Sequence, residues 1–302
     1  MKKLIYLIVA LNICVAGLAQ SSSTLFDRAV KKYYNQDFKG AIEDYTKFIE
    51  RNSNNAKAYV SRGLAKYYLQ DFEGAIADQD KAIQLNPGYA DAYFNKGDCK
   101  YNMQDYEGAI AEYTKTLEIK PKDAMALTSR GLTKQYIKDY KGAVEDFSLA
   151  IKYHPKVADA YIYRGIAKYY LGDYEDAIAD YSKSIKVQPL SDAYFNRGNA
   201  KDALKDFAAA LKDYNQAIEM NPKHFKAMHN RGLTRISLNE NKGAIEDFSK
   251  AIEVNPRYGD AYYNRGVAKL NLGLKEAACQ DLRSAEQLGQ IKAKAALKNN
   301  CE

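Results

Sequence analysis

The sequence contains no tryptophan, three histidines and only six prolines among its 302 residues. Histidine is the commonest general base and a frequent metal ligand. None of His154, His224 and His229 has a carboxylate or cysteine at the spacing of a metal site or catalytic triad. Glycine-rich phosphate loops are also missing, because the glycines fall at regular helix-packing or turn positions. We therefore expect no enzyme activity, no metal site and no cofactor.

No segment of the chain has a marked excess of basic or of acidic residues. The chain carries 45 Lys and Arg against 38 Asp and Glu, a net charge of +7, and the cations are interspersed with acids. A nucleic-acid-binding surface would need a basic patch. The sequence predicts no nucleic-acid partner.

Long hydrophobic runs occur only at the start of the chain. Lys2 and Lys3 precede an apolar stretch over residues 4–18, and small residues precede Gln20. This pattern is typical of a secretory signal peptide over residues 1–19, cleaved after Ala19. The protein is then exported, to the periplasm or the medium, and the mature chain has no transmembrane segment. A retained anchor is the alternative, and a lipoprotein site at Cys14 is disfavoured by the bulky Ile13.

The few prolines are evenly spaced. The intervals between them are 34, 34, 34, 33 and 34 residues, for Pro87, Pro121, Pro155, Pro189, Pro222 and Pro256. A period near 34 is typical of a repeat made of one helical hairpin, and such hairpins stack into a solenoid. With Ala56 as position 1, the sequence predicts eight repeats at 22–55, 56–89, 90–123, 124–157, 158–190, 191–224, 225–258 and 259–289.

Small residues recur at two positions of each repeat. Position 20 is always alanine, and position 8 is glycine in every repeat but the first, as at Gly63. Glycine within a helix costs roughly 0.5–1 kcal/mol relative to alanine. We interpret these glycines as packing residues that another backbone approaches closely.

Together these features resemble the tetratricopeptide repeat family. The small position 8, the alanine at 20, aromatic residues at 17 and 24, and the closing proline match it over residues 22 to about 289. The resemblance implies an all-α, right-handed α-solenoid with a concave groove lined by the first helix of each repeat. It also implies a protein or peptide partner.

The chain departs from the common family pattern at position 7, where arginine or lysine stands in place of the usual leucine. Position 23 is always aspartate or glutamate. In an antiparallel hairpin these two positions stand nearly level. We interpret them as a structural ladder of ion pairs, with a ligand-binding row of arginines as the alternative. The predicted pairs are Arg62–Asp78, Arg130–Asp146, Arg164–Asp180, Arg197–Asp213 and Arg231–Asp247.

Aromatic residues concentrate on the predicted groove. Tyrosine suits interfaces because it has an apolar face and a polar tip. The alternative is that these rings pack between repeats. Family members that bind the terminal carboxylate of a partner have lysine at position 5 and asparagine at position 9. In this chain only Asn199 matches that pattern, and Phe195 stands where the lysine would be, so this carboxylate clamp is absent. The predicted groove residues are Tyr33, Tyr34, Tyr67, Tyr68, Phe94, Tyr101, Tyr136, Tyr169, Tyr170, Phe195 and Asn199.

These features favour a non-catalytic exported scaffold or adaptor that binds a peptide or protein along the tyrosine-rich groove. A glycan- or peptidoglycan-binding module of the cell envelope, whose tyrosines stack on sugar rings, is an alternative. A purely structural spacer is another.

The C-terminal end lacks the closing proline. Residues 290–302 are predicted to hold a capping helix from about Ile291, with Ile291, Ala295 and Leu297 turned inward. Cys279 and Cys301 lie on roughly antiparallel helices 22 residues apart, and export permits oxidation. We predict a Cys279–Cys301 disulfide and a free, buried Cys99.

Overall fold

The computed structural model describes residues 24–301, so the predicted signal peptide lies outside the described residues. The described chain is all-α, and residues 24–301 include no strand. A helix over residues 24–34 comes first. Within the same range no helix has both the length and the apolar character needed to cross a membrane.

Every repeat forms one helical hairpin. After residues 24–34, the first helices of the repeats are α3 (Ala56–Tyr68), α5 (Ala90–Asn102), α7 (Ala124–Tyr136), α9 (Ala158–Leu171), α11 (Ser191–Ala203), α13 (Phe225–Ser237) and α15 (Gly259–Asn271). The second helices are α2 (Phe38–Arg51), α4 (Phe72–Leu85), α6 (Tyr106–Ile119), α8 (Tyr140–Tyr153), α10 (Tyr174–Val187), α12 (Phe207–Met220), α14 (Asn241–Val254) and α16 (Lys275–Gln287). From α3 onward, each first helix begins at the residue where the sequence period begins.

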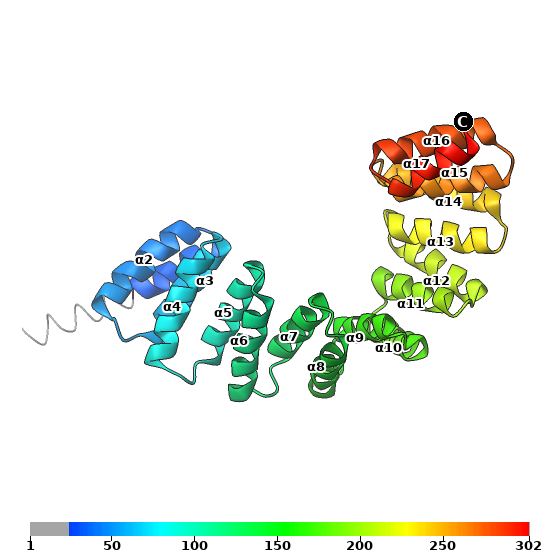
Figure 1. Cartoon of the computed structure of the whole chain (residues 1–302). Coiled ribbons are helices and arrows are strands. Elements are labelled where there is room, and N and C mark those ends of the chain that lie inside the picture. The colour runs from blue at the N-terminus through cyan, green and yellow to red at the C-terminus, as the bar shows by residue number, and fades with distance from the viewer. Residues whose placement is uncertain (1–23, 302) are drawn as a thin grey trace, which may run out of the picture. The chain divides into compact units, whose positions relative to one another are not determined.

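The chain divides into two compact parts, an N-terminal block up to Tyr153 and a C-terminal block from His154. Within each block, helices pack side by side in chain order (Figure 1). The first helices of successive repeats are also in contact: α9 contacts α11, and α11 contacts α13. Each block is therefore a solenoid segment with its first helices along one side.

The two helices of a hairpin are joined by a turn whose position 15 has a positive φ. Gln70 has φ 63° and Gly172 has φ 89°, and lysine or asparagine takes this conformation in other repeats. The following aspartate often caps the second helix, as Asp71 does by accepting from the Gly74 N–H at 2.9 Å. The positive-φ turn, with the aspartate cap where it is present, marks where the second helix starts.

The interpretation of the position-8 glycines needs a correction. A Cβ on Gly131 would lie 2.8 Å from Phe147 Cε1, and one on Gly165 would lie 2.6 Å from Tyr181 Cε1. The group that crowds these glycines is thus the aromatic ring at position 24 of the same repeat. At Gly63 and Gly266, where the ring is replaced, a backbone carbonyl 3.2 Å away is among the nearest atoms.

This packing predicts the result of adding one methyl group. Gly131→Ala is expected to lower the free energy of unfolding by about 1–3 kcal/mol, because Phe147 is fully buried and must shift. Chemical denaturation measures the effect. Gly88→Ala is the matched control, since its Cβ would meet only Asn86 Oδ1 at 3.5 Å. Equal stability of the two variants would contradict the packing argument.

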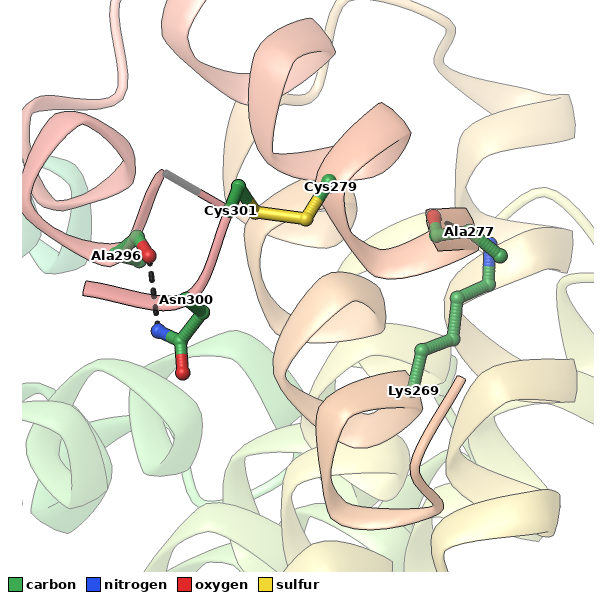
Figure 2. The surroundings of a disulfide bond; sticks show 6 residues. All are labelled: Lys269, Ala277, Cys279, Ala296, Asn300 and Cys301. Atoms are coloured by element: carbon green, nitrogen blue, oxygen red, sulfur yellow. Dashed lines mark hydrogen bonds between the residues drawn. A yellow bond between two sulfur atoms is a disulfide. The ribbon is translucent and has the colours of Figure 1, made fainter. Parts of the chain in front are cut away.

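The C-terminal end is closed by α17 (Ile291–Asn300), which packs on α16. Cys279 of α16 and Cys301 form a disulfide with a Cα–Cα distance of 5.8 Å (Figure 2). Of the three residues predicted to turn inward, Leu297 is half-buried, but Ile291 is 89% exposed and Ala295 is exposed. The buried residue of α17 is Ala293. Residues three and four positions after Ala293, Ala296 and Leu297, are half-buried, so the inward face follows helical spacing from Ala293.

Candidate functional site

The cations at position 7 lie against the acids at position 23 in every repeat. Arg62 is representative: its Nε lies 2.9 Å from Asp78 Oδ2 and its Nη2 lies 2.6 Å from Oδ1. The same two-bond geometry joins Arg28–Asp44, Arg130–Asp146, Arg164–Asp180, Arg197–Asp213, Arg231–Asp247 and Arg265–Asp281. In the third repeat Lys96 and Glu112 take the same places at 3.0 Å.

Each acid also binds the cation at position 11. Lys66 Nζ lies 2.8 Å from Asp78 Oδ2, so one carboxylate separates two cations on the same face of α3. In the first repeat, hydrogen bonds from Arg28, opposed by burial but reinforced by Lys32, lower the pKa of Asp44 to about 2. The carboxylate at position 23 thus offsets the repulsion between two cations on one helix face.

The arginines also connect neighbouring repeats. Arg62 Nη1 donates to Thr46 Oγ1 of the preceding repeat at 3.1 Å, and Arg197 Nη1 donates to Ser182 Oγ at 3.0 Å. The nitrogens of these guanidinium groups are therefore engaged within the solenoid. This arrangement favours the structural role of the row over ligand binding.

The predicted tyrosine row divides into two sets. The rings at position 13 are exposed, with Tyr34 at 78% and Tyr170 at 61%; Tyr68 and Tyr136 are similar. The rings at position 12 are half-buried against the aromatic residue at position 17 of the same repeat. These contacts are Tyr33–Phe38, Tyr67–Phe72, Tyr101–Tyr106 and Tyr169–Tyr174, with centroids 5.2–5.6 Å apart.

Some exposed rings also pack between repeats. Tyr68 stacks on Phe38 of the preceding repeat at 4.9 Å, and Tyr136 lies 4.5 Å from Tyr106. Both interpretations of the row therefore have structural support. Tyr170 lies edge-on to Tyr169, with ring centroids 5.8 Å apart, and makes a further interaction as well.

The C-terminal block has two neighbouring pockets on its first helices. One, of about 290 Å³, is lined by Asp159, Ile162, Tyr163, Ile166, Asp192, Phe195, Asn196, His224 and Lys226. The other, of about 310 Å³, is lined by Tyr169, Tyr170, Asn199, Asp202, Ala203, Tyr214, Asn230 and Leu233. Both are built mainly on α9, α11 and α13, so the two pockets bring together four of the predicted groove residues, Tyr169, Tyr170, Phe195 and Asn199.

A polar network that the sequence analysis missed supports the second pocket. Asn199 Oδ1 accepts from Asn230 Nδ2 at 2.8 Å and from the Tyr214 hydroxyl at 2.9 Å. Thr234 Oγ1 donates to Asp202 Oδ1 at 2.5 Å. Asparagine recurs at position 6 in the last three repeats, at Asn196, Asn230 and Asn264, but only Asn230 of these belongs to the network, so the signal was partial.

Two histidines of this block, His224 and His229, lie at the start of α13 and within it. His229 is buried, and its Nε2 lies 2.9 Å from Asn264 Nδ2. His224 Nδ1 accepts from the Ala227 N–H at 3.1 Å and so caps α13, while its Nε2 lies 3.4 Å from Asp192. Burial lowers the pKa of both histidines. No cluster of three metal-ligating side chains exists within residues 24–301.

The N-terminal block has a smaller pocket. It has a volume of about 210 Å³, and its lining includes Tyr33 and Tyr34 together with Phe26, Val30 and Leu64. In the third repeat Phe94 packs 5.6 Å from Tyr113, whose hydroxyl donates to Asp98 at 2.7 Å. Cys99 is a free, buried thiol, and burial together with the charge of Asp98 raises its pKa to about 12.

Comparison with known proteins agrees with this architecture. Tetratricopeptide repeat profiles match residues 26–89, 60–124, 158–189, 191–224 and 259–288, and a TPR repeat profile matches 232–273. The chain belongs to the tetratricopeptide repeat family. Members of this family are protein–protein interaction scaffolds and generally lack catalytic activity. None of the curated proteins matches the sequence.

Solved tetratricopeptide structures share the fold. A repeat protein from Parabacteroides merdae is 20% identical, with a TM-score of 0.65 over 82% of this chain and 99% of its own. YrrB, described as having an unusual peptide-binding site, is 23% identical, with a TM-score of 0.56 over 62% of this chain and 97% of its own. MamA is 27% identical, with a TM-score of 0.50 over 54% of this chain and 96% of its own.

Proposed function

We propose that this protein is an exported, non-catalytic scaffold that holds an extended peptide segment of a protein partner against its first helices. The observation that carries the proposal is the pair of neighbouring pockets on α9, α11 and α13. They combine aromatic rings, of which that of Tyr170 is exposed, with side-chain amides. Aromatic rings supply contact area at low entropic cost, and amides supply both donors and acceptors for a peptide backbone.

The proposed export rests on two features. Residues 1–19 have the pattern of a signal peptide, and the Cys279–Cys301 disulfide suits an oxidising compartment. Expression in a bacterial host, followed by N-terminal sequencing of the exported protein, tests this part. We expect the mature chain to begin at Gln20, and retention of Met1 in a cytoplasmic product would contradict it.

Peptide binding is tested with a phage-displayed random-peptide library panned on the mature protein. Peptides are expected to enrich, and a synthetic copy should bind Tyr170→Ala about tenfold more weakly, because an exposed aromatic contact is lost. Fluorescence anisotropy measures the affinity. The melting temperature should change little, since Tyr170 is 61% exposed.

Tyr169→Ala and Tyr34→Ala are the matched comparisons. Tyr169 packs 5.2 Å from Tyr174, so its loss should lower stability as well as binding. Tyr34 is equally a position-13 ring but belongs to the N-terminal block, so its loss should leave binding in the C-terminal block unchanged. Enrichment of no peptide, together with binding of peptidoglycan or polysaccharide fragments, would replace this proposal with the glycan-binding alternative.

A further inference from the structure

Most cations on the first helices of the C-terminal block are committed to the ion-pair ladder. On α11, Arg197 and Lys201 both bind Asp213, at 2.7 Å each. On α13, Arg231 and Arg235 both bind Asp247. These four side chains therefore point to second helices and do not line either pocket.

The charged residues that do line the two pockets are mainly acidic. They are Asp159, Asp192 and Asp202, against the single cation Lys226 and the half-buried His224. The chain as a whole has a net charge of +7, so this acidic character is local to the pockets. An anionic ligand would meet repulsion here, whereas a cationic one would find complementary charge.

Asp202 is the charged group of the second pocket. Its Oδ1 accepts from Thr234, which fixes the carboxylate, and no hydrogen bond to Oδ2 occurs in the described part of the chain. Asp202 takes part in none of the ion pairs formed by residues 24–301, although Lys201 is its neighbour in sequence. A half-buried, unpaired carboxylate in a pocket is a binding group for a cation.

The walls of the same pocket are aromatic and apolar. Tyr169, Tyr170 and Tyr214 line it together with Ala203 and Leu233. Tyrosine faces attract ammonium and guanidinium groups, and an apolar wall suits the methylene stem that carries them. A purely apolar side chain would instead bury the Asp202 carboxylate without a countercharge, which is unfavourable.

We propose that the pocket of Tyr169, Tyr170, Asp202 and Tyr214 receives the side chain of a lysine or arginine from the bound partner peptide. This inference rests on the proposed function and specifies its ligand. The cationic head pairs with Asp202 Oδ2, its stem lies along Leu233 and Ala203, and the exposed ring of Tyr170 covers the head. The partner is therefore a basic peptide segment.

The test uses two phage-displayed pools of random peptides, panned on the full mature protein. One pool has Lys or Arg fixed at its central position, and the other has Glu or Leu there. The first pool is expected to enrich at least about tenfold over the second. Asp202→Asn should abolish that difference, because asparagine retains the acceptor for Thr234 but loses the charge.

A matched variant controls for overall charge. Glu246→Gln removes one negative charge from an exposed position of α14 away from both pockets, and it should leave the preference intact. For a synthetic peptide from the first pool, Asp202→Asn and replacement of the basic residue by norleucine should each weaken binding about tenfold. Together they should weaken it little more than either alone, because both remove the same contact. Affinity for the wild-type protein should also fall more steeply with salt than affinity for Asp202→Asn.

The outcomes separate the two proposals. Equal enrichment of both pools, or peptide binding that is insensitive to Asp202→Asn, overturns the basic-residue pocket and leaves the peptide-binding scaffold standing. Enrichment of the Glu or Leu pool alone overturns the pocket in the same way. Enrichment of neither pool overturns both.

Discussion

Replacing Asp78 by asparagine is expected to lower the free energy of unfolding by about 3–5 kcal/mol. Asp78 is 3% exposed and holds both Arg62 and Lys66, so its loss leaves two neighbouring cations facing each other without an anion. Urea denaturation followed by circular dichroism measures the loss. Glu50→Gln removes an exposed acid from α2 and serves as the control, with an expected change near zero.

The same cluster predicts how the loss is reversed. Arg62→Leu combined with Asp78→Leu should recover only part of the stability, because Lys66 then lacks its carboxylate partner. Adding Lys66→Met should recover most of the rest, since packed apolar side chains often replace a buried ionic cluster without loss. Additive effects of the three substitutions would show that Arg62, Lys66 and Asp78 do not act as one cluster.

Periodicity carried most of the fold prediction because each repeat makes the same contacts. Prolines at intervals of 33 or 34 residues located the hairpins, and alanine at position 20 located the helix contact. The prediction went wrong where one contact could be made in two ways. A glycine such as Gly131 signals close approach, but the sequence does not say whether a backbone or the ring of Phe147 approaches. At α17, where no repeat pattern applies, Ala293 turned inward instead of Ile291.

The candidate site was harder to predict for a physical reason. Ion pairs within a hairpin depend only on the register of two helices, so Arg62 and Asp78 could be matched by counting. The pocket around Asp202 depends on three successive first helices, and its polar network involves side-chain amides whose partners are more than thirty residues away, as Asn199 and Asn230 are. Exposure within the tyrosine row could not be predicted either, since Tyr169 and Tyr170 are neighbours in sequence but differ in burial.

Opening the Cys279–Cys301 disulfide is expected to release the C-terminal end at a cost of about 3 kcal/mol, the value for a loop of this length. α17 is a ten-residue helix that packs on α16, with Ala293 as its buried residue, so it has little burial of its own to hold it in place. In a solenoid each repeat contacts only its neighbours, so the loss should be confined to this end. Hydrogen exchange is expected to accelerate across residues 291–300 after reduction and to stay unchanged in α9 and α11.

Cys301→Ser provides the matched variant. Cys301 is only half-buried, so a serine hydroxyl is accommodated there, and the free thiol that remains at Cys279, which is 6% exposed, behaves as a small apolar group. This variant should exchange as fast as the reduced wild type, and reductant should have no further effect on it, since Cys99 is a free thiol. Peptide mapping of the oxidised mature protein should recover Cys279 and Cys301 linked. Unchanged exchange of residues 291–300 after reduction would show that α17 is held by packing alone.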